Sequence, residues 1–182
     1  QPDEIRVTFM GSSPLPRPGQ TGTSVFVELG NGDRFIFDFG PGSIANYLAS
    51  KVPLNQINDI FITHLHWDHF ASVPYGFVFG AWGGRWDETY RNTGPSGRTP
   101  RHGIKHMVSS MKEMLFWHME NFSAGSPIGK GFDIEVNEFD FRKDGGVAYE
   151  KNGVRVIHWQ QSHGSDGASP YQLDWNGMGL AV

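Results

Sequence analysis

The sequence of 182 residues contains no cysteine, so it forms no disulfide and offers no thiolate to a metal. It also lacks an apolar run long enough to cross a bilayer, and we expect no membrane partner. Charged residues make up only 19%, with a net charge of −4, which disfavours a nucleic-acid backbone as the main partner. The length and the 38% of hydrophobic residues predict a single domain over residues 1–182 with its own core.

Glycine and proline are abundant instead, with 24 and 11 residues, and they favour tight turns between strands over a helical bundle. Hydrophobic periodicity predicts an α/β chain. The expected strands are residues 5–10, 23–29, 34–39, 59–63, 134–141, 147–150, 154–160, 172–175 and 178–182, and the expected helices are residues 43–50, 70–80 and 102–121. Ser43 is a candidate helix cap, and the prolines of residues 11–20 (Pro14, Pro16 and Pro18) predict a loop.

The most informative stretch is Thr63-His64-Leu65-His66-Trp67-Asp68-His69, directly after the apolar run Ile60-Phe61-Ile62. The run is short, β-branched and aromatic, so it predicts a buried strand. Side chains two apart on extended backbone point the same way, so His64 and His66 can bind one ion from the strand end. Asp68 and His69 follow in a turn and can face a second ion. These ligands suit zinc, and less exclusively iron or manganese; the alternative is a histidine-rich loop without metal.

The H-x-H-x-D-H pattern after an apolar strand resembles the signature of the metallo-β-lactamase-fold hydrolases. Within that superfamily the chain looks most like the branch that includes ribonuclease Z, and by motif it is similar to the hydrolase type named after guanitoxin biosynthesis. The resemblance runs from Val7 to the end of the chain. It implies a four-layer αβ/βα sandwich with a dinuclear metal site at one edge of the sheets.

A catalytic zinc usually has three protein ligands, so His64 and His66 need a partner, and the candidates are His158 and His163. The family's third histidine follows a strand and precedes a Y-x-L-x-x-x-G hairpin. The segments His163-Gly164-Ser165-Asp166-Gly167 and Tyr171-Gln172-Leu173-Asp174-Trp175-Asn176-Gly177 resemble that arrangement, which assigns His163 as the ligand. His158 falls inside a predicted strand, which favours a place in the core or behind the ligands.

The segment Asp38-Phe39-Gly40-Pro41-Gly42 resembles the family's D-x-G turn, whose aspartate usually supports the metal loop from behind. Ligand loops need such carboxylates to orient them, so we favour this role for Asp38. The alternative is an ordinary turn residue or a cap for the next helix.

Residues 82–103 are rich in Gly, Trp and Arg and have little periodicity, which predicts a loop insertion near the site. Trp82, Trp86 and Tyr90 offer stacking faces, and the arginines of the segment, Arg85 among them, offer charge to an anion, so one hypothesis is a substrate wall. The alternatives are a solvated loop or a dimer contact.

Two further patterns lie in or beside this segment. Gly94-Pro95-Ser96-Gly97 resembles the G-P-x-G segment of the ribonuclease Z-like branch, and five cations give a local basic excess: Arg85, Arg91, Arg98, Arg101 and Lys105. For His102, His106 and His118, a surface or pocket position is favoured over a metal ligand.

The two ends of the sequence suggest processing. The chain begins at Gln1 without a methionine, which slightly favours an exported or periplasmic protein. After a last strand such as Gly179-Leu180-Ala181-Val182, the family continues into an S-G-D turn whose aspartate bridges both metals, and later supplies a further histidine. We therefore expect these residues to be the N-terminal part of a longer protein, completed by a continuation, by a complementing C-terminal chain or within a homo-oligomer.

The resemblance implies a metal-dependent hydrolase with one or two zinc ions, in which a zinc-activated hydroxide attacks the substrate. His64, His66 and His163 would hold the first metal. Asp68 and His69 would hold the second, and Asp68 would act as the catalytic carboxylate. We expect a small-molecule substrate with an ester, lactone or amide-type bond. The alternatives are a phosphodiesterase or ribonuclease Z-like nuclease, supported by the basic cluster, an iron-dependent oxygenase on the same fold, and a non-catalytic binding protein.

Overall fold

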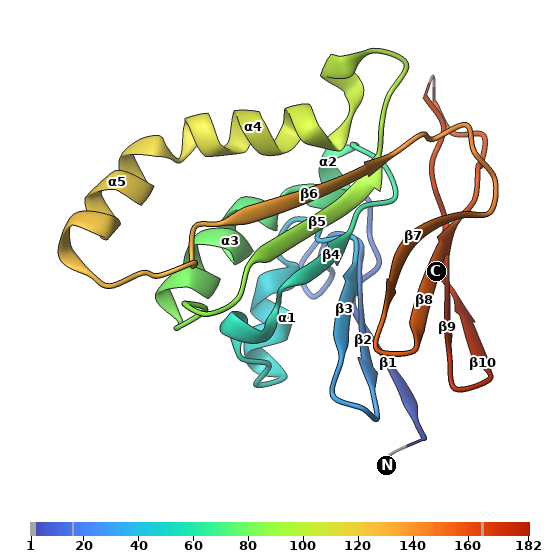
Figure 1. Ribbon diagram of the computed structural model, residues 1–182, viewed down its shortest axis with the longest axis horizontal. Helices are drawn as coiled ribbons and strands as arrows, with labels where there is room; N and C mark the ends of the chain where they lie inside the picture. The colour runs from blue at the N-terminus through green and yellow to red at the C-terminus, as the bar shows by residue number, and fades with distance from the viewer. Residues whose placement is uncertain (1–2, 16, 165) are drawn as a thin grey trace.

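The computed structural model describes residues 3–15, 17–164 and 166–182 (Figure 1). Gln1, Pro2, Pro16 and Ser165, which belong to the expected N-terminus, loop and histidine motif, lie outside the described residues. The first sheet has the order β1-β2-β3-β4-β5-β6, with β1 Ile5–Gly11, β2 Ser24–Leu29, β3 Arg34–Phe37, β4 Asp59–Phe61, β5 Tyr90–Pro95 and β6 Ile134–Phe139. The second has the order β10-β9-β8-β7, with β7 Gly146–Lys151, β8 Val154–His158, β9 Tyr171–Trp175 and β10 Met178–Ala181.

Helices cover one face of the first sheet, and the second sheet covers the other (Figure 1). The helical elements are α1 Ser43–Ala49, η1 Leu54–Gln56, α2 Trp67–Phe70, α3 Val73–Trp82, η2 Pro100–His102, α4 Ile104–Met114 and α5 Phe116–Gly125. In the described part of the chain this arrangement gives three successive layers of the expected sandwich, helices, sheet and sheet. In the part of the chain that the structure describes, no helix is long and apolar enough to span a membrane.

Alternation along the strands of the first sheet builds two cores, because successive side chains point to opposite faces. Phe26, Ile36 and Ile60 face the helices and are almost fully buried there. Phe37 and Phe61 face the second sheet, where their rings stack at 5.1 Å and both meet the ring of Tyr171 from β9. The first sheet is therefore apolar on both faces, and it holds its strand ends rigidly.

The strand directions decide where functional side chains collect. Strands β3, β4, β5 and β6 run parallel to one another, while β2 is antiparallel to both of its neighbours, β1 and β3. The carboxyl ends of parallel strands meet at one edge of the sheet, which is where open α/β sheets bind ligands. Asp38 directly follows β3, the histidine motif follows β4, and Ser96 follows β5.

Several expected elements differ from the structure. Residues 82–103 are not a loop insertion, because β5 lies there, paired on both sides in the sheet. The helix expected over residues 102–121 is divided at Leu115 into α4 and α5, and α2 precedes the helix expected to begin at residue 70. Gly42 rather than Ser43 occupies the cap of α1, with a left-handed φ of 79° that a glycine adopts freely. The other bounds differ by one to three residues, mostly at frayed strand ends.

Candidate metal centre

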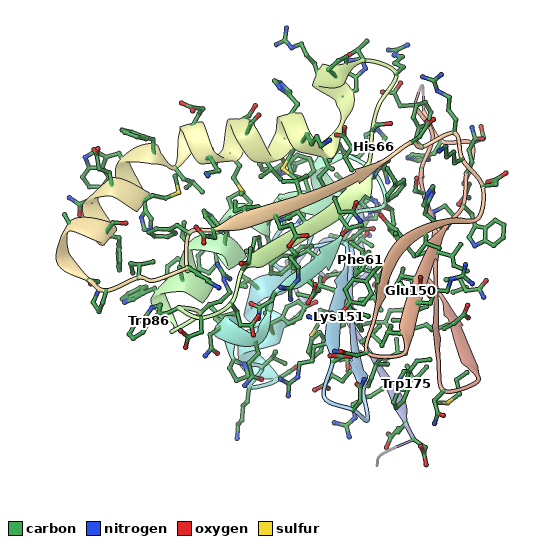
Figure 2. All side chains as sticks on the ribbon, in the orientation of Figure 1. Phe61, His66, Trp86, Glu150, Lys151 and Trp175 are labelled. Atoms are coloured by element: carbon green, nitrogen blue, oxygen red, sulfur yellow. The ribbon has the colours of Figure 1, made fainter. Side chains whose placement is uncertain are left out.

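Three histidines converge at the carboxyl edge of the first sheet. One ring nitrogen from each of His64, His66 and His163 lies within 4.8 Å of the others. His64 Nε2 is 3.0 Å from His66 Nδ1, and His163 Nε2 is 3.2 Å from the same His66 nitrogen. Figure 2 shows His66 at the end of the strands where β4 and β5 meet the loops from the second sheet.

The separations of these nitrogens fit a tetrahedral metal. Ligand nitrogens about 2.05 Å from a zinc ion, at tetrahedral angles, are about 3.3 Å apart. The two measured separations, 3.0 and 3.2 Å, are close to that value. Burial, aided by the charges of His69 and the other histidines, lowers the pKa of His64 to about 3. His64 is therefore neutral, which is the form that binds a metal.

Chain geometry brings His163 to this place from far along the sequence. The loop after β8 is closed by two backbone hydrogen bonds of 2.9 Å between Gln161 and Ala168. The next residue, Ser169, donates its N–H to the carbonyl of Thr63 at 2.9 Å, and the Tyr171 hydroxyl donates to Ile62 O at 2.8 Å. The second sheet is thus attached directly to the segment that carries His64 and His66.

Asp38 lies behind the motif as expected. It is 4% exposed and has a left-handed φ of 58°, which aspartate tolerates better than most residues. The backbone N–H of Thr63 donates to its Oδ1 at 2.8 Å, and His69 Nδ1 donates to its Oδ2 at 2.6 Å. Burial opposes the charge on His69, but the hydrogen bond to Asp38 and the charges of Asp38 and Asp68 raise its pKa. Asp38 thereby fixes which nitrogen of His69 carries the proton, and Nε2 faces the site.

Asp68 and His69 lie beside the three-histidine cluster. Asp68 Oδ2 is 3.4 Å from His69 Nε2, and the rings of His69 and His64 are 4.1 Å apart. Asp68 and His69 are thus adjacent to the three histidines, and their role as ligands of a second ion stays a prediction.

The cluster opens into a pocket of about 320 Å³. His64, His66 and His163 line it. Arg98, Arg101, His102 and Asp166 form a further wall of the same pocket, with Pro95 and Ser96 at the end of β5. The pocket therefore combines metal-binding groups with cationic side chains.

Three residues expected in the substrate wall, Trp82, Arg85 and Trp86, do not line the pocket, so their assignment to it is wrong, whereas Arg98 and Arg101 of the same segment do line it. Arg85 is 1% exposed, and its guanidinium donates to the carbonyls of Phe77 at 2.7 Å and Gly131 at 3.0 Å. Trp86 donates its indole N–H to Ala81 O at 2.9 Å, and Figure 2 places it at the far end of the molecule from His66. These side chains join the end of α3 to the sheet.

Trp82 likewise serves packing, since its ring lies 5.3 Å from Phe79 and 5.8 Å from Phe122 of α5. His158 is in the core, as favoured: it is 2% exposed and stacks on Phe139 at 3.7 Å. It does not line the pocket of the three histidines.

Sequence reasoning named Arg98 and Arg101 in the basic excess of residues 85–105 near the site, and both line the pocket. It missed the role of Asp166, although the H-x-x-D-G pattern at His163 contained the signal. Arg91, a member of that basic excess, is bound instead to Asp59 at 2.6 and 2.7 Å on another face.

Known proteins resemble this chain both in sequence and in fold. A family model described as the metallo-beta-lactamase superfamily matches residues 17–76. Ribonuclease Z of Methanothermobacter thermautotrophicus is 28% identical over 87% of this chain and 45% of its own length. Ribonuclease Z of Halobacterium salinarum is 32% identical over 87% of this chain and 44% of its own length. The chain thus spans less than half the length of these curated relatives.

A solved structure of human tRNase Z, short form, matches with a TM-score of 0.71 at 17% identity, over 98% of this chain and 68% of its own. A metallo-beta-lactamase fold protein from Bacillus subtilis matches with a TM-score of 0.67 at 14% identity, over 98% of this chain and 62% of its own. The layered sheets match those of these structures, so the chain has the metallo-β-lactamase fold. In sequence it is similar to the metallo-beta-lactamase superfamily over residues 17–76 and to ribonuclease Z over most of the chain's length.

Proposed function

We propose that the protein is a metal-dependent phosphodiester hydrolase. The observation that carries this proposal is the position of the three convergent histidines in one pocket with Arg98 and Arg101. A phosphodiester is an anion, and arginine recognises phosphate oxygens through paired N–H donors. Relatives named ribonuclease Z and zinc phosphodiesterase support the same class. The sequence alone favoured a small ester, lactone or amide, and the comparisons favour the alternative instead.

The candidate ligands fit zinc by number, type and spacing. His64, His66 and His163 would hold one ion, and Asp68 with His69 would contribute to a second. A bound metal would supply Lewis-acid polarisation of the phosphoryl oxygen and would lower the pKa of the attacking water. The geometry of the histidines and the neutrality of His64 support this assignment.

The chain's own groups have separate tasks in this proposal. Asp38 holds His69 in one orientation through the 2.6 Å hydrogen bond at Nδ1. Asp68, with its Oδ2 near the site, accepts the proton that the attacking water releases. Arg98 and Arg101, which line the same pocket, offset the negative charge of the phosphodiester as it approaches.

The test is a substrate panel with the zinc-loaded protein: bis-p-nitrophenyl phosphate, a β-lactam and a lactone series. The proposal expects hydrolysis of the phosphodiester above the other substrates. It also expects loss of that hydrolysis in Asp68→Ala, with no loss in Asp87→Ala, which removes an exposed carboxylate on another part of the surface. Preferential cleavage of lactones or lactams would refute phosphodiester specificity.

A further inference from the structure

The wall formed by Arg98, Arg101, His102 and Asp166 is held by hydrogen bonds and close contacts of its backbone. Ser96 N–H donates to Phe139 O at 2.7 Å, and His102 N–H donates to Thr99 O at 2.9 Å. Gly97 lies so close to His102 that a Cβ on the glycine would be 2.1 Å from the Cβ of His102. The segment between β5 and α4 is therefore held in one shape, with its cationic side chains over the pocket.

Asp166 joins two of those side chains. Its Oδ1 is 3.1 Å from Arg98 Nε, and its Oδ2 is 3.2 Å from His102 Nδ1. Among the described residues the Oδ1 atom has no hydrogen bond of good geometry, so the Arg98 contact is an ion pair rather than an aligned bond. Asp166 thus fixes one edge of Arg98 and one nitrogen of His102, while the other guanidinium donors and His102 Nε2 remain for a ligand.

Arg101 completes the wall, and in the described part of the chain its side chain has no hydrogen bond or ion pair. Two guanidinium groups therefore accompany one carboxylate, which leaves a net positive charge on this wall. Arginine is weakly hydrated and presents several donors in a plane, so an unpaired arginine beside a metal pocket favours a phosphate group as its acceptor.

We propose that Arg98 and Arg101, with His102, form a subsite for a second phosphate of the substrate, adjacent to the phosphodiester that is cleaved. Asp166 is the positioning residue of this subsite. This inference rests on the proposed function and narrows it: the substrate class is a phosphodiester that carries a further phosphate, as a nucleotide strand does. The competing explanation is that the ion pairs only link the segment after β5 to the loop after β8.

Binding can be measured without a metal, by titrating a nucleoside 3′,5′-bisphosphate into the metal-free protein calorimetrically at low salt. Removing one charged donor from a phosphate should weaken binding by about tenfold or more, so we expect that loss in Arg98→Ala and in Arg101→Ala. The matched control is Arg6→Ala, which removes an exposed arginine of β1, far along the sheet from the pocket. An equal Kd in all four proteins would overturn the proposal.

Catalysis gives a second measurement, with a dinucleotide compared with the same dinucleotide bearing a terminal phosphate. We expect Arg101→Ala to lower kcat/KM for the phosphorylated dinucleotide about tenfold more than it lowers kcat/KM for bis-p-nitrophenyl phosphate, which has no second phosphate. Equal effects on both substrates would contradict a separate subsite. If the wild-type protein cleaves no phosphodiester, the proposed function fails, while the calorimetric result still decides the subsite.

The variant Asp166→Asn separates positioning from simple linkage of the two loops. If Asp166 positions Arg98 and His102, Asp166→Asn should weaken bisphosphate binding while the zinc content stays unchanged. A variant that loses only unfolding free energy, with the Kd for the bisphosphate intact, would establish the structural explanation and overturn the proposed role.

Discussion

Asp38 is the carboxylate on which the motif loop depends, and its replacement gives a quantitative prediction. In Asp38→Ala the half-buried Thr63 N–H loses its acceptor, which costs about 1–3 kcal/mol, and the charge-assisted bond to His69 is lost at about 1.5–3 kcal/mol. Alanine in the left-handed conformation of residue 38 adds about 1–2 kcal/mol. Because both partners, Thr63 and His69, are only half-buried, we expect a total near the lower end of the sum, about 3.5–5 kcal/mol.

Asp38→Asn should cost less, about 1–2 kcal/mol, because asparagine tolerates the left-handed backbone and keeps an acceptor for Thr63. The assay is urea unfolding of the metal-free proteins at neutral pH, followed by tryptophan fluorescence, with Asp87→Ala as an exposed control. The expected order of midpoints is wild type, Asp38→Asn, then Asp38→Ala, at equal m-values. Identical midpoints for the two Asp38 variants, or a wild-type midpoint for Asp38→Ala, would refute the reasoning.

Three further predictions concern residues outside the three-histidine cluster. Burial lowers the pKa of His158 below its ordinary 6.5, so the unfolded chain takes up a proton first as the pH falls, and the stability that His158 contributes is present above pH 6.5 and is lost below it. The loss of unfolding free energy between about pH 7.5 and about pH 5.5 should therefore be smaller in His158→Gln than in the wild type, and an equal loss would contradict this account. Arg85→Met leaves buried carbonyls without a donor and should lower the unfolding free energy by about 2–4 kcal/mol without changing substrate preference; altered preference would restore the wall hypothesis. Gly97→Ala forces His102 to move and should cost about 1–3 kcal/mol and weaken bisphosphate binding at unchanged zinc content, whereas unaltered binding would argue against a rigid segment.

Sequence patterns within a few residues were enough to predict the strand before the histidine motif and the shared direction of its first two histidines. The apolar run Ile60-Phe61-Ile62 and the spacing of His64 and His66 depend on strand geometry alone, and the structure has both features. The placement of Asp38 and His163 beside the motif came from family resemblance, because no local rule brings residues so distant in the sequence together.

Tertiary structure overrode the sequence pattern over residues 82–103. The expected substrate wall placed Arg85 at the site, yet the carbonyls at the end of α3 and the ring of Tyr90, 4.5 Å from its guanidinium carbon, accommodate it in the interior. The contribution of Asp166 to the pocket was equally hidden, since its partners Arg98 and His102 belong to a loop after a different strand.

The central claim, that His64, His66 and His163 hold a metal, is tested most directly by the zinc affinity of the metal-free protein. Equilibrium titration would compare the wild type with His163→Ala and His158→Gln. The account predicts that His163→Ala binds zinc more weakly by well over about tenfold, because even groups that only orient metal ligands contribute that much, and that His158→Gln binds as the wild type does. Equal zinc affinity in the His163 variant and the wild type, or a greater loss in the His158 variant, would contradict it.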